Sequence, residues 1–550
     1  MRVLWKRTLR ADLGRFSVPN VVNEPYLHYA PGSKERNALL VALDKFRPTV
    51  DIPCVLGGKE VRTGDLGTQV MPFEHKSVVS TYHQVTDAVA QQAIDAAMAA
   101  KKRWEGMPWE DRAAVFLKAA DLLATKYRAE VCAAVMIGTG KNVWQAEIDV
   151  VEAIDFWRLG VKFAEQIYSA QPPFNAPGNW NYMEHRPLEG FITAISPFNF
   201  VAIGANLPSA PAIMGNTSVW KPSNTALLGN YLLYQILVEA GLPEGVINFL
   251  PGDGKVLGRH TFSHRDFGGL HFTGSTATFN ALWKEIADNL TKYKSYPRIV
   301  GETGGKNFHF VHESADVGQV VFHSIRSAFE YSGQKCSACS RAYIPRKSFD
   351  KFKSQLVEQM KDIKLGDPRE FDTFMSAVID EVAFKKITEG IEAAKQSSDC
   401  EIIAGGGYSS DVGYYVEPTV IVTRDPCFKT MREELFGPVL TVFVYDENKF
   451  EETLDLCNES TYALTGAVFA QDRHVLRYAS DRLRHAAGNM YLNDKSTGSI
   501  VGQQPFGGSR LSGTNDKSGS GLNLMRWVSP RVIKETFIPV SGWKYPHMDH

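Results

Sequence analysis

The sequence predicts an α/β protein with two successive series of alternating strands and helices. In residues 190–306, short apolar runs end at polar or glycine-rich motifs and alternate with helical patterns. A second series of similar size begins near residue 307 and continues to about residue 493. Because strands that alternate with helices are typical of right-handed βαβ units, each series is expected to form a parallel sheet.

Helical patterns dominate the chain before this alternation. They cover residues 35–46, 87–104, 109–137 (as two helices) and 145–169. Thr86 and Asp87 are suitable caps for the second of these helices. Residues 171–181 begin with a glutamine and two prolines, and are predicted to form a loop that opens a hairpin.

Each series has its own expected elements. In the first, strands are expected at residues 191–196, 219–222, 246–250 and 270–273, and helices at 205–214, 226–240 and 256–263. In the second, strands are expected at 308–311, 341–344, 419–422, 439–444 and 467–469, and helices at 317–331, 349–361 and 382–395. The tail after Arg531 is predicted to be a strand without a local partner, which can extend a sheet elsewhere in the chain or in another subunit.

Composition and charge favour a protein that acts on small molecules. The 550-residue chain has a net charge of −1 and is 44% hydrophobic, so no strong field points to nucleic acid or an acidic membrane. No apolar run reaches the ~18 residues that a membrane span needs. The seven cysteines are scattered, which favours free thiols in a reducing compartment over a disulfide framework.

The N-terminus is basic, amphipathic and poor in acids. Its first 18 residues carry five arginines and lysines against the single acid Asp12, interleaved with Leu, Trp and Phe. This composition is typical of a mitochondrial transit segment, which we place at residues 1–20. The alternative is a disordered basic tail on a cytosolic protein.

Polar motifs follow the expected strands of the first series, where ligands collect in parallel sheets. Residues 274–278 form a Gly-Ser turn before a helix, and a helix N-terminus suits a phosphate. No GxGxxG fingerprint follows any strand. Lys221 can reach a ribose or phosphate, or can simply lie on the surface. Asn199 can donate to an oxyanion, or can form a local turn.

Cys336 and Glu302 carry the clearest chemistry. Cys336 follows a Gly-Gln-Lys turn, and Glu302 lies between an apolar run and a Gly-Gly turn. A thiol that attacks carbon and a carboxylate that activates water can together form and hydrolyse a thioester. Each residue alone also fits a structural role, as a small buried side chain or a solvated turn. The single CxxC of Cys336 and Cys339 has no second pair or nearby His, so no metal site is expected.

Seven motifs together resemble those of the aldehyde dehydrogenase superfamily. In chain order they are SPFNF, WKPS, FTGS, GETGGKN, GQKCSAC, EELFGPV and PFGGSRLSG, between residues 196 and 513. The resemblance implies an aldehyde dehydrogenase fold: a Rossmann-like NAD-binding domain (residues 21–170 and 190–306) and a second α/β catalytic domain (307–512). It also implies a small β oligomerisation flap made of a hairpin (171–189) and the tail (513–550).

The resemblance implies a mechanism and a cofactor. Cys336 would attack the aldehyde, Asn199 with the Cys336 N–H would hold the oxyanion, and Glu302 would activate the hydrolytic water. NAD would be bound by Ser196, Lys221, Ser223, Gly274, Ser275, Thr276, Ala277, Thr278, Glu434 and Phe436. Asn224 stands where many members have an acid that favours NAD over NADP, yet NAD is the expected cofactor.

The resemblance is strongest to a branch that oxidises L-glutamate 5-semialdehyde, formed from 1-pyrroline-5-carboxylate, to L-glutamate in proline catabolism. The expected substrate-binding residues are Phe200, Ser337, Gly498, Ser499 and Phe506, with Glu152 a candidate for the α-ammonium group. A homodimer or higher homo-oligomer in the mitochondrial matrix is expected, with transient contact to proline dehydrogenase. The alternatives are oxidation of another semialdehyde or aliphatic aldehyde, a CoA-acylating enzyme, and a non-catalytic protein on the same scaffold.

Overall fold

The computed structural model describes residues 17–548. The expected targeting segment, residues 1–20, lies outside this range except for its last four residues. Between residues 17 and 548, no helix combines the length and the apolar character that crossing a bilayer requires.

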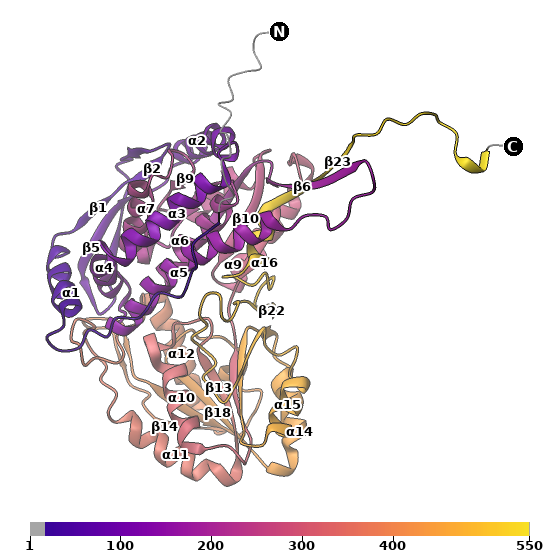
Figure 1. Cartoon of the computed structure of the whole chain (residues 1–550). Coiled ribbons are helices and arrows are strands. Elements are labelled where there is room, and N and C mark those ends of the chain that lie inside the picture. Colours follow the sequence, from indigo (N-terminus) through magenta and orange to yellow (C-terminus); the bar gives the residue numbers. More distant parts are fainter. Residues whose placement is uncertain (1–16, 549–550) are drawn as a thin grey trace.

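A seven-stranded sheet forms the centre of the first half of the molecule (Figure 1). Its strands are β2 (Cys54–Leu56), β3 (Lys59–Val61), β7 (Phe191–Ile195), β8 (Thr217–Lys221), β9 (Ile247–Phe249), β10 (Phe267–Thr273) and β11 (Arg298–Glu302). In the order β11-β10-β7-β8-β9-β2-β3, the first five strands are parallel, and β2 runs antiparallel to both of its neighbours, β9 and β3. The α/β prediction is confirmed. The three-residue strands β2 and β3 are not predicted, because they are too short to show periodicity.

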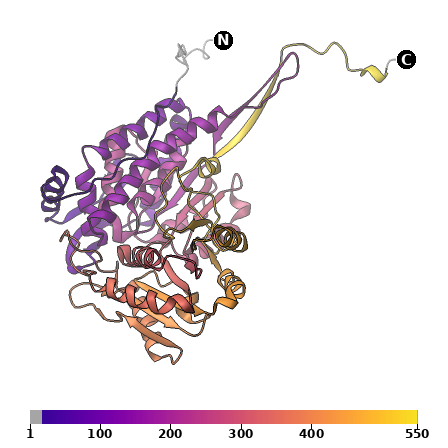
Figure 2. The same ribbon diagram turned by 60° about the horizontal axis from the view of Figure 1, so that its bottom comes forward.

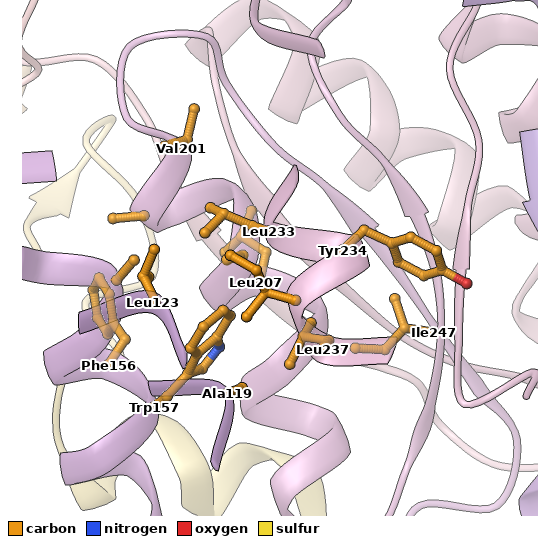
Figure 3. Packing of buried hydrophobic residues seen from close by; sticks show 14 of the residues in the cluster. Ala119, Leu123, Phe156, Trp157, Val201, Leu207, Leu233, Tyr234, Leu237 and Ile247 are labelled. Carbon is orange, nitrogen blue, oxygen red and sulfur yellow. The ribbon is translucent and has the colours of Figure 1, made fainter. Parts of the chain in front are cut away.

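Helices cover both faces of this sheet because successive strand residues point to opposite sides. Phe191 of β7 packs in one core cluster and its neighbour Ile192 in another. The first cluster includes α2 (Asp87–Glu105), α8 (Gly254–Thr261) and α9 (Thr276–Asp288). The second includes α3 (Trp109–Ala124), α4 (Arg128–Thr139), α5 (Val143–Ser169), α6 (Val201–Ile213) and α7 (Leu227–Ala240). Figure 3 shows Trp157, Leu207 and Leu237 packed together in this second cluster.

A second seven-stranded sheet forms the other half. Its order is β14-β17-β18-β13-β12-β20-β21, parallel except for β14. The strands are β12 (Asn307–Val311), β13 (Cys339–Pro345), β14 (Cys400–Ala404), β17 (Thr419–Thr423), β18 (Val439–Tyr445), β20 (Thr465–Phe469) and β21 (Asn489–Leu492). Ala342 and Tyr343 of β13 face different core clusters, so this sheet is also covered on both sides. The covering helices are α10 (Val317–Phe329), α11 (Arg346–Met360), α12 (Glu381–Gln396), α14 (Phe450–Asn458) and α15 (Arg473–Arg482).

Two smaller β structures complete the fold. A three-stranded sheet of β1 (Val50–Ile52), β5 (Glu74–His83) and β4 (Leu66–Met71), which is not predicted, follows α1 (Lys34–Lys45). The segment expected as a hairpin contributes one strand, β6 (Asn179–Pro187), after a loop. Its partner is the C-terminal strand β23 (Val528–Thr536), aligned antiparallel over nine residue pairs. Figures 1 and 2 show this ribbon projecting from the body of the molecule.

A short turn links the edge strand β11 of the first sheet to β12, an inner strand of the second. β11 ends at Glu302 and β12 begins at Asn307, so only the four residues 303–306 connect the sheets. The carboxyl ends of β7, β8, β10 and β11 therefore face the amino ends of β12 and β13. Ligands of parallel sheets collect beyond the carboxyl ends of strands, so this junction is the expected place for a site.

The second core cluster provides a stability test with a built-in control. Leu237 of α7 is completely buried, whereas the next residue, Val238, is 49% exposed. Leu237→Ala should lower the free energy of unfolding by about 2–5 kcal/mol, because it leaves a cavity. Val238→Ala should change it by less than about 0.5 kcal/mol. Chemical denaturation followed by fluorescence measures both, and equal effects would contradict this packing.

Candidate active site

Cys336 lies in the loop before β13, at the junction of the two sheets. Tyr331 and Ser332 have left-handed backbone conformations, with φ of 51° and 53°, and turn the chain sharply before it. Cys336 is partly exposed, while its neighbours Lys335 and Ser337 are buried. We call residues 331–338 the nucleophile loop, after the role predicted for Cys336. Its residues on either side of Cys336 are buried, while the Cys336 side chain is partly exposed.

Two asparagines bind the backbone of this loop. The Nδ2 of Asn199 donates to the carbonyl of Gln334 at 3.1 Å. The Nδ2 of Asn307 donates to the carbonyl of Cys336 at 2.7 Å, and its Oδ1 accepts from the Thr465 N–H at 3.0 Å. Asn199 is therefore next to the nucleophile loop, as the sequence predicts. Asn307 is a supporting residue that the sequence analysis missed.

Three carboxyl groups lie close enough to the Cys336 thiol to affect its pKa. Burial raises the pKa of the Cys336 thiol, and the carboxyl groups of Glu302, Glu434 and Glu152 raise it further. Burial also raises the pKa of Glu302 to about 8, although Lys517 opposes the shift. One Glu302 oxygen, Oε1, is buried without a hydrogen-bond partner among the described residues. A carboxyl group with a pKa near neutrality is suited to accept a proton from water.

A buried carboxylate on α5 holds the loop that carries Asn199. The Asp149 carboxylate accepts hydrogen bonds from the N–H groups of Val201 at 3.0 Å and Ala202 at 2.8 Å. It thus caps α6, whose own N-cap residue, Phe200, supplies no side-chain hydrogen bond. Asp149 is paired with Lys141 at 2.8 Å, and the Lys141 ammonium lies 3.7 Å from the centre of the Phe200 ring.

The residues after β10 form an open helix N-terminus. The Ser275 hydroxyl accepts the Thr278 N–H at 3.2 Å and so caps α9, which begins at Thr276 and continues through Ala277. The Gly274 N–H donates to the carbonyl of Glu302 at 3.1 Å, which links this turn to the end of β11. The first turn of α9 therefore presents N–H groups toward the sheet junction.

The polar residues at the ends of β7 and β8 differ in whether they form hydrogen bonds within the protein. Burial lowers the pKa of Lys221, the last residue of β8, to about 8. The Ser223 hydroxyl lies 3.1 Å from that of Thr225. The Ser196 hydroxyl accepts from the Trp220 indole at 3.0 Å, which leaves its own O–H free to donate. Asn224 exchanges two hydrogen bonds with the backbone of Gly252 and so shapes a neighbouring loop.

Glu434 reaches the turn that joins the sheets. Its Oε1 accepts the Gly305 N–H at 2.8 Å, and burial raises its pKa. Phe436 has a φ of 60° and packs edge-on against Phe198, with ring centres 5.8 Å apart. The loop before β18 is therefore in contact with the loop that carries Asn199.

The predicted substrate residues lie in two neighbouring loops. The hydroxyls of Ser337 and Thr497 are 2.6 Å apart, which joins the nucleophile loop to the loop of Gly498 and Ser499. Among the described residues, the backbone N–H groups of Gly498 and Ser499 have no hydrogen-bond partner. Phe506 follows in the same segment, where its backbone pairs with Ser518. Two free adjacent N–H groups are suited to bind a carboxylate.

A buried ionic cluster also joins these two loops and was not predicted. Glu330 accepts from the Lys335 ammonium at 2.8 Å and lies 3.6 Å from that of Lys495. Burial favours the protonated acid, but the two lysines have the larger combined effect and lower the pKa of Glu330 to about 2.

A surface cavity of about 830 Å³ between β17, β18 and α14 contains none of the candidate site residues described above.

Comparison with known proteins gives full-length matches. The model of the aldehyde dehydrogenase family matches residues 63–532. The mitochondrial delta-1-pyrroline-5-carboxylate dehydrogenase of Dictyostelium discoideum is 55% identical over 98% of both chains. The Mycobacterium tuberculosis delta-pyrroline-5-carboxylate dehydrogenase, solved with NAD, is 47% identical with a TM-score of 0.94, covering 98% of this chain and 100% of that one. Proline utilization A of Bdellovibrio bacteriovorus is 31% identical with a TM-score of 0.91, covering 96% of this chain and 55% of that one.

These matches agree with the ordered motifs and with the two sheets that meet at Cys336 and Glu302. The family model spans most of the chain, and the relatives match it from end to end. The chain therefore belongs to the aldehyde dehydrogenase family.

Proposed function

We propose that the protein oxidises L-glutamate 5-semialdehyde, the open form of 1-pyrroline-5-carboxylate, to L-glutamate with NAD. The proposal rests chiefly on the relatives of the same length that carry the name of this dehydrogenase, one of them solved with NAD. The free N–H groups of Gly498 and Ser499 add to it, because this aldehyde differs from simple ones in its carboxylate and ammonium groups. A plain aliphatic aldehyde has no carboxylate, so its oxidation does not require the free N–H groups of Gly498 and Ser499.

The residues at the sheet junction support a thioester mechanism. Cys336 attacks the aldehyde carbon, and the Asn199 amide with the Cys336 N–H stabilises the oxyanion of the thiohemiacetal. NAD, which the residues around the N-terminus of α9 would hold, would supply the hydride acceptor for oxidation of this adduct to the Cys336 thioester. Glu302 then takes a proton from water, which attacks the thioester and releases L-glutamate.

The first sheet fits the cofactor. The capped N-terminus of α9, residues 274–278, suits the pyrophosphate, and Lys221 with Ser223 suits the adenine ribose. Glu434 and Phe436 lie at the turn between the sheets, where they suit the nicotinamide ribose. We assign residues 21–170 and 190–306 to the NAD-binding domain and 307–512 to the catalytic domain. Ser196 directly follows β7, and its hydroxyl accepts from the Trp220 indole while its own O–H can donate to the cofactor.

The loops of the second sheet fit the rest of the substrate. Ser337, Gly498 and Ser499 bind the α-carboxylate, and Phe200 with Phe506 contacts the aliphatic chain. Burial, together with Asp149, raises the pKa of Glu152 to about 8. An ammonium group beside this carboxyl favours its charged form, so Glu152 is suited to the α-amino group.

The nucleophile is tested with two cysteines three residues apart. With NAD and 1-pyrroline-5-carboxylate, Cys336→Ala should lower turnover by ~10³-fold or more, since no other thiol replaces it. Cys339, which is fully buried in β13, is the control, and Cys339→Ala should retain activity. NADH absorbance measures both. Turnover by Cys336→Ala, or no NADH from the unmodified protein, would refute the proposal.

The role of Glu302 predicts a pH dependence. Its folded pKa of about 8 means that the basic carboxylate is the minor form at pH 7 and the major form above pH 8. Steady-state turnover limited by hydrolysis should therefore rise between pH 7 and 9. Glu302→Gln should give one rapid burst of NADH per subunit and then almost none, because the thioester persists. Stopped-flow absorbance separates the burst from the steady state, and an unchanged steady-state rate in Glu302→Gln would contradict this role.

The β6–β23 ribbon suggests a homo-oligomer. Its projecting strands and the following tail carry exposed apolar side chains, including Trp180, Val532, Phe537 and Ile538. Exposed patches of this kind mark interaction surfaces, and we propose that residues 171–189 and 513–550 pair subunits.

Placing a charge on this ribbon tests the pairing. Val532→Asp should convert the oligomer to smaller species in analytical ultracentrifugation, because a charge in an apolar interface is costly. Val412→Asp is the control, since Val412 is similarly exposed on a loop before β16 (Tyr415–Val416). A mass unaffected by Val532→Asp argues against this interface.

We place the protein in the mitochondrial matrix. The basic, acid-poor N-terminus and the mitochondrial name of the relative support this placement. Proline utilization A extends well beyond the part matched by this chain. We also propose transient contact with a separate, proline-oxidising partner, proline dehydrogenase.

A further inference from the structure

We propose that Asn23 is a positioning residue that holds the loop of Gly498 and Ser499 at a fixed distance from α5. Asn23 belongs to the N-terminal arm, residues 17–33, which precedes α1. The inference rests on the proposed function, because it takes this loop as the binding site of the substrate α-carboxylate. It assigns the arm a part in substrate recognition.

The Asn23 amide joins three parts of the chain. Its Nδ2 donates to Oδ2 of Asp155 on α5 at 2.7 Å and to the carbonyl of Val501 at 2.8 Å. Its Oδ1 accepts from Nε2 of Gln503 at 2.9 Å. A carboxylate and a carbonyl can only accept, so the NH₂ group must face Asp155 and Val501. Both amide hydrogens and the oxygen are therefore used.

The arm itself is firmly attached, so Asn23 is a fixed support. The Glu24 N–H donates to Oδ1 of Asp155 at 2.8 Å, and the Leu27 N–H donates to Oε1 of Glu147 at 2.7 Å. Glu24 also forms a buried salt bridge to Arg128 of α4 at 2.6 Å. Near the start of the arm, the Val18 N–H donates to Oε1 of Glu165 at 2.7 Å, so three carboxylates of α5 hold it.

The loop of Gly498 and Ser499 is held in place on both sides of its free N–H groups. On one side, Thr497 contacts Ser337 of the nucleophile loop. On the other side, Val501 is held by Asn23, and Gly502 packs on α5 so closely that a Cβ atom there would lie 2.9 Å from Leu159. Gly498 and Ser499 lie between these two attachments. The position of their N–H groups thus depends on Asn23.

The same arrangement relates the two ends of the substrate. Glu152, proposed to meet the α-ammonium group, lies three residues before Asp155 on α5, and residues so spaced share one helix face. Asp155 holds Asn23, which holds the loop proposed to bind the α-carboxylate. A single helix therefore sets the distance between the sites for the two charged groups of an α-amino acid.

The test compares two aldehydes. In Asn23→Ala, KM for glutamate semialdehyde should rise about tenfold, while kcat stays within about twofold. The rise is of the size expected when the N–H groups of Gly498 and Ser499 lose their hydrogen bonds to the substrate carboxylate. KM for propanal, which lacks both charged groups, should stay unchanged. The neighbour Val22 is 77% exposed, and Val22→Ala should match the unmodified protein. Hydrogen exchange of residues 496–504 should accelerate in Asn23→Ala only.

A second variant and a second readout make the outcome decisive. Gln503→Ala removes one contact of Asn23 and should raise KM for the semialdehyde by a smaller factor. Adding it to Asn23→Ala should raise KM no further, because the contact is already lost. Equal rises in KM for both aldehydes, or unchanged exchange of residues 496–504, would overturn the proposal. If the unmodified protein does not oxidise glutamate semialdehyde, the proposed function fails, while hydrogen exchange still tests the Asn23 contact.

Discussion

The active site depends on how closely the turn between β11 and β12 passes the loops around it. A Cβ atom on Gly304 would lie 2.1 Å from the Glu434 carboxylate, and one on Gly305 would lie 2.7 Å from the carbonyl of Cys336. No larger residue fits at either position without displacing these neighbours. Because Glu302 ends β11 directly before this turn, the close approach brings Glu302, Cys336 and Glu434 into one electrostatic environment.

Helix α5 arranges the other components of the site. Asp149, Glu152 and Asp155 are spaced three residues apart, so they project from one side of the helix. Asp149 fixes the start of α6 and hence the Asn199 loop, and Asp155 fixes the N-terminal arm. Burying Asp149 with Lys141 has a large desolvation cost, which such a pair offsets only when its hydrogen bonds are well satisfied. Here the carboxylate has three donors.

The low polarity of the junction affects acid and thiol in the same direction. Burial raises the pKa of Glu302, which brings its basicity into a useful range. It also raises the pKa of Cys336, which keeps the sulfur protonated. A neutral thiol is less nucleophilic and less easily oxidised than a thiolate. The environment that makes Glu302 suited to its proposed role as base therefore also keeps the proposed nucleophile, Cys336, in its less reactive form.

The α/β class, most strands of the two large sheets and the motifs around Cys336 and Glu302 are predictable from the amino-acid sequence. These are what the sequence predicted correctly. These features are local, since apolar runs and turn residues report their own conformation. It did not predict β2 or β3, or the sheet of β1, β4 and β5, because these strands are short or lack a clear alternation. It also did not reveal that the Ser196 hydroxyl accepts a hydrogen bond from the Trp220 indole.

The residues that support the site from distant segments became apparent only in the folded chain. Asp149 contacts Val201, Asn23 contacts Val501, and β6 pairs with β23, all between segments far apart in the chain. Nothing local marks Asp149 as the cap of another helix or Asn23 as a support for a loop. Such contacts exist because folding brings hydrogen-bonding groups from separate segments together in buried places, where each must find a partner.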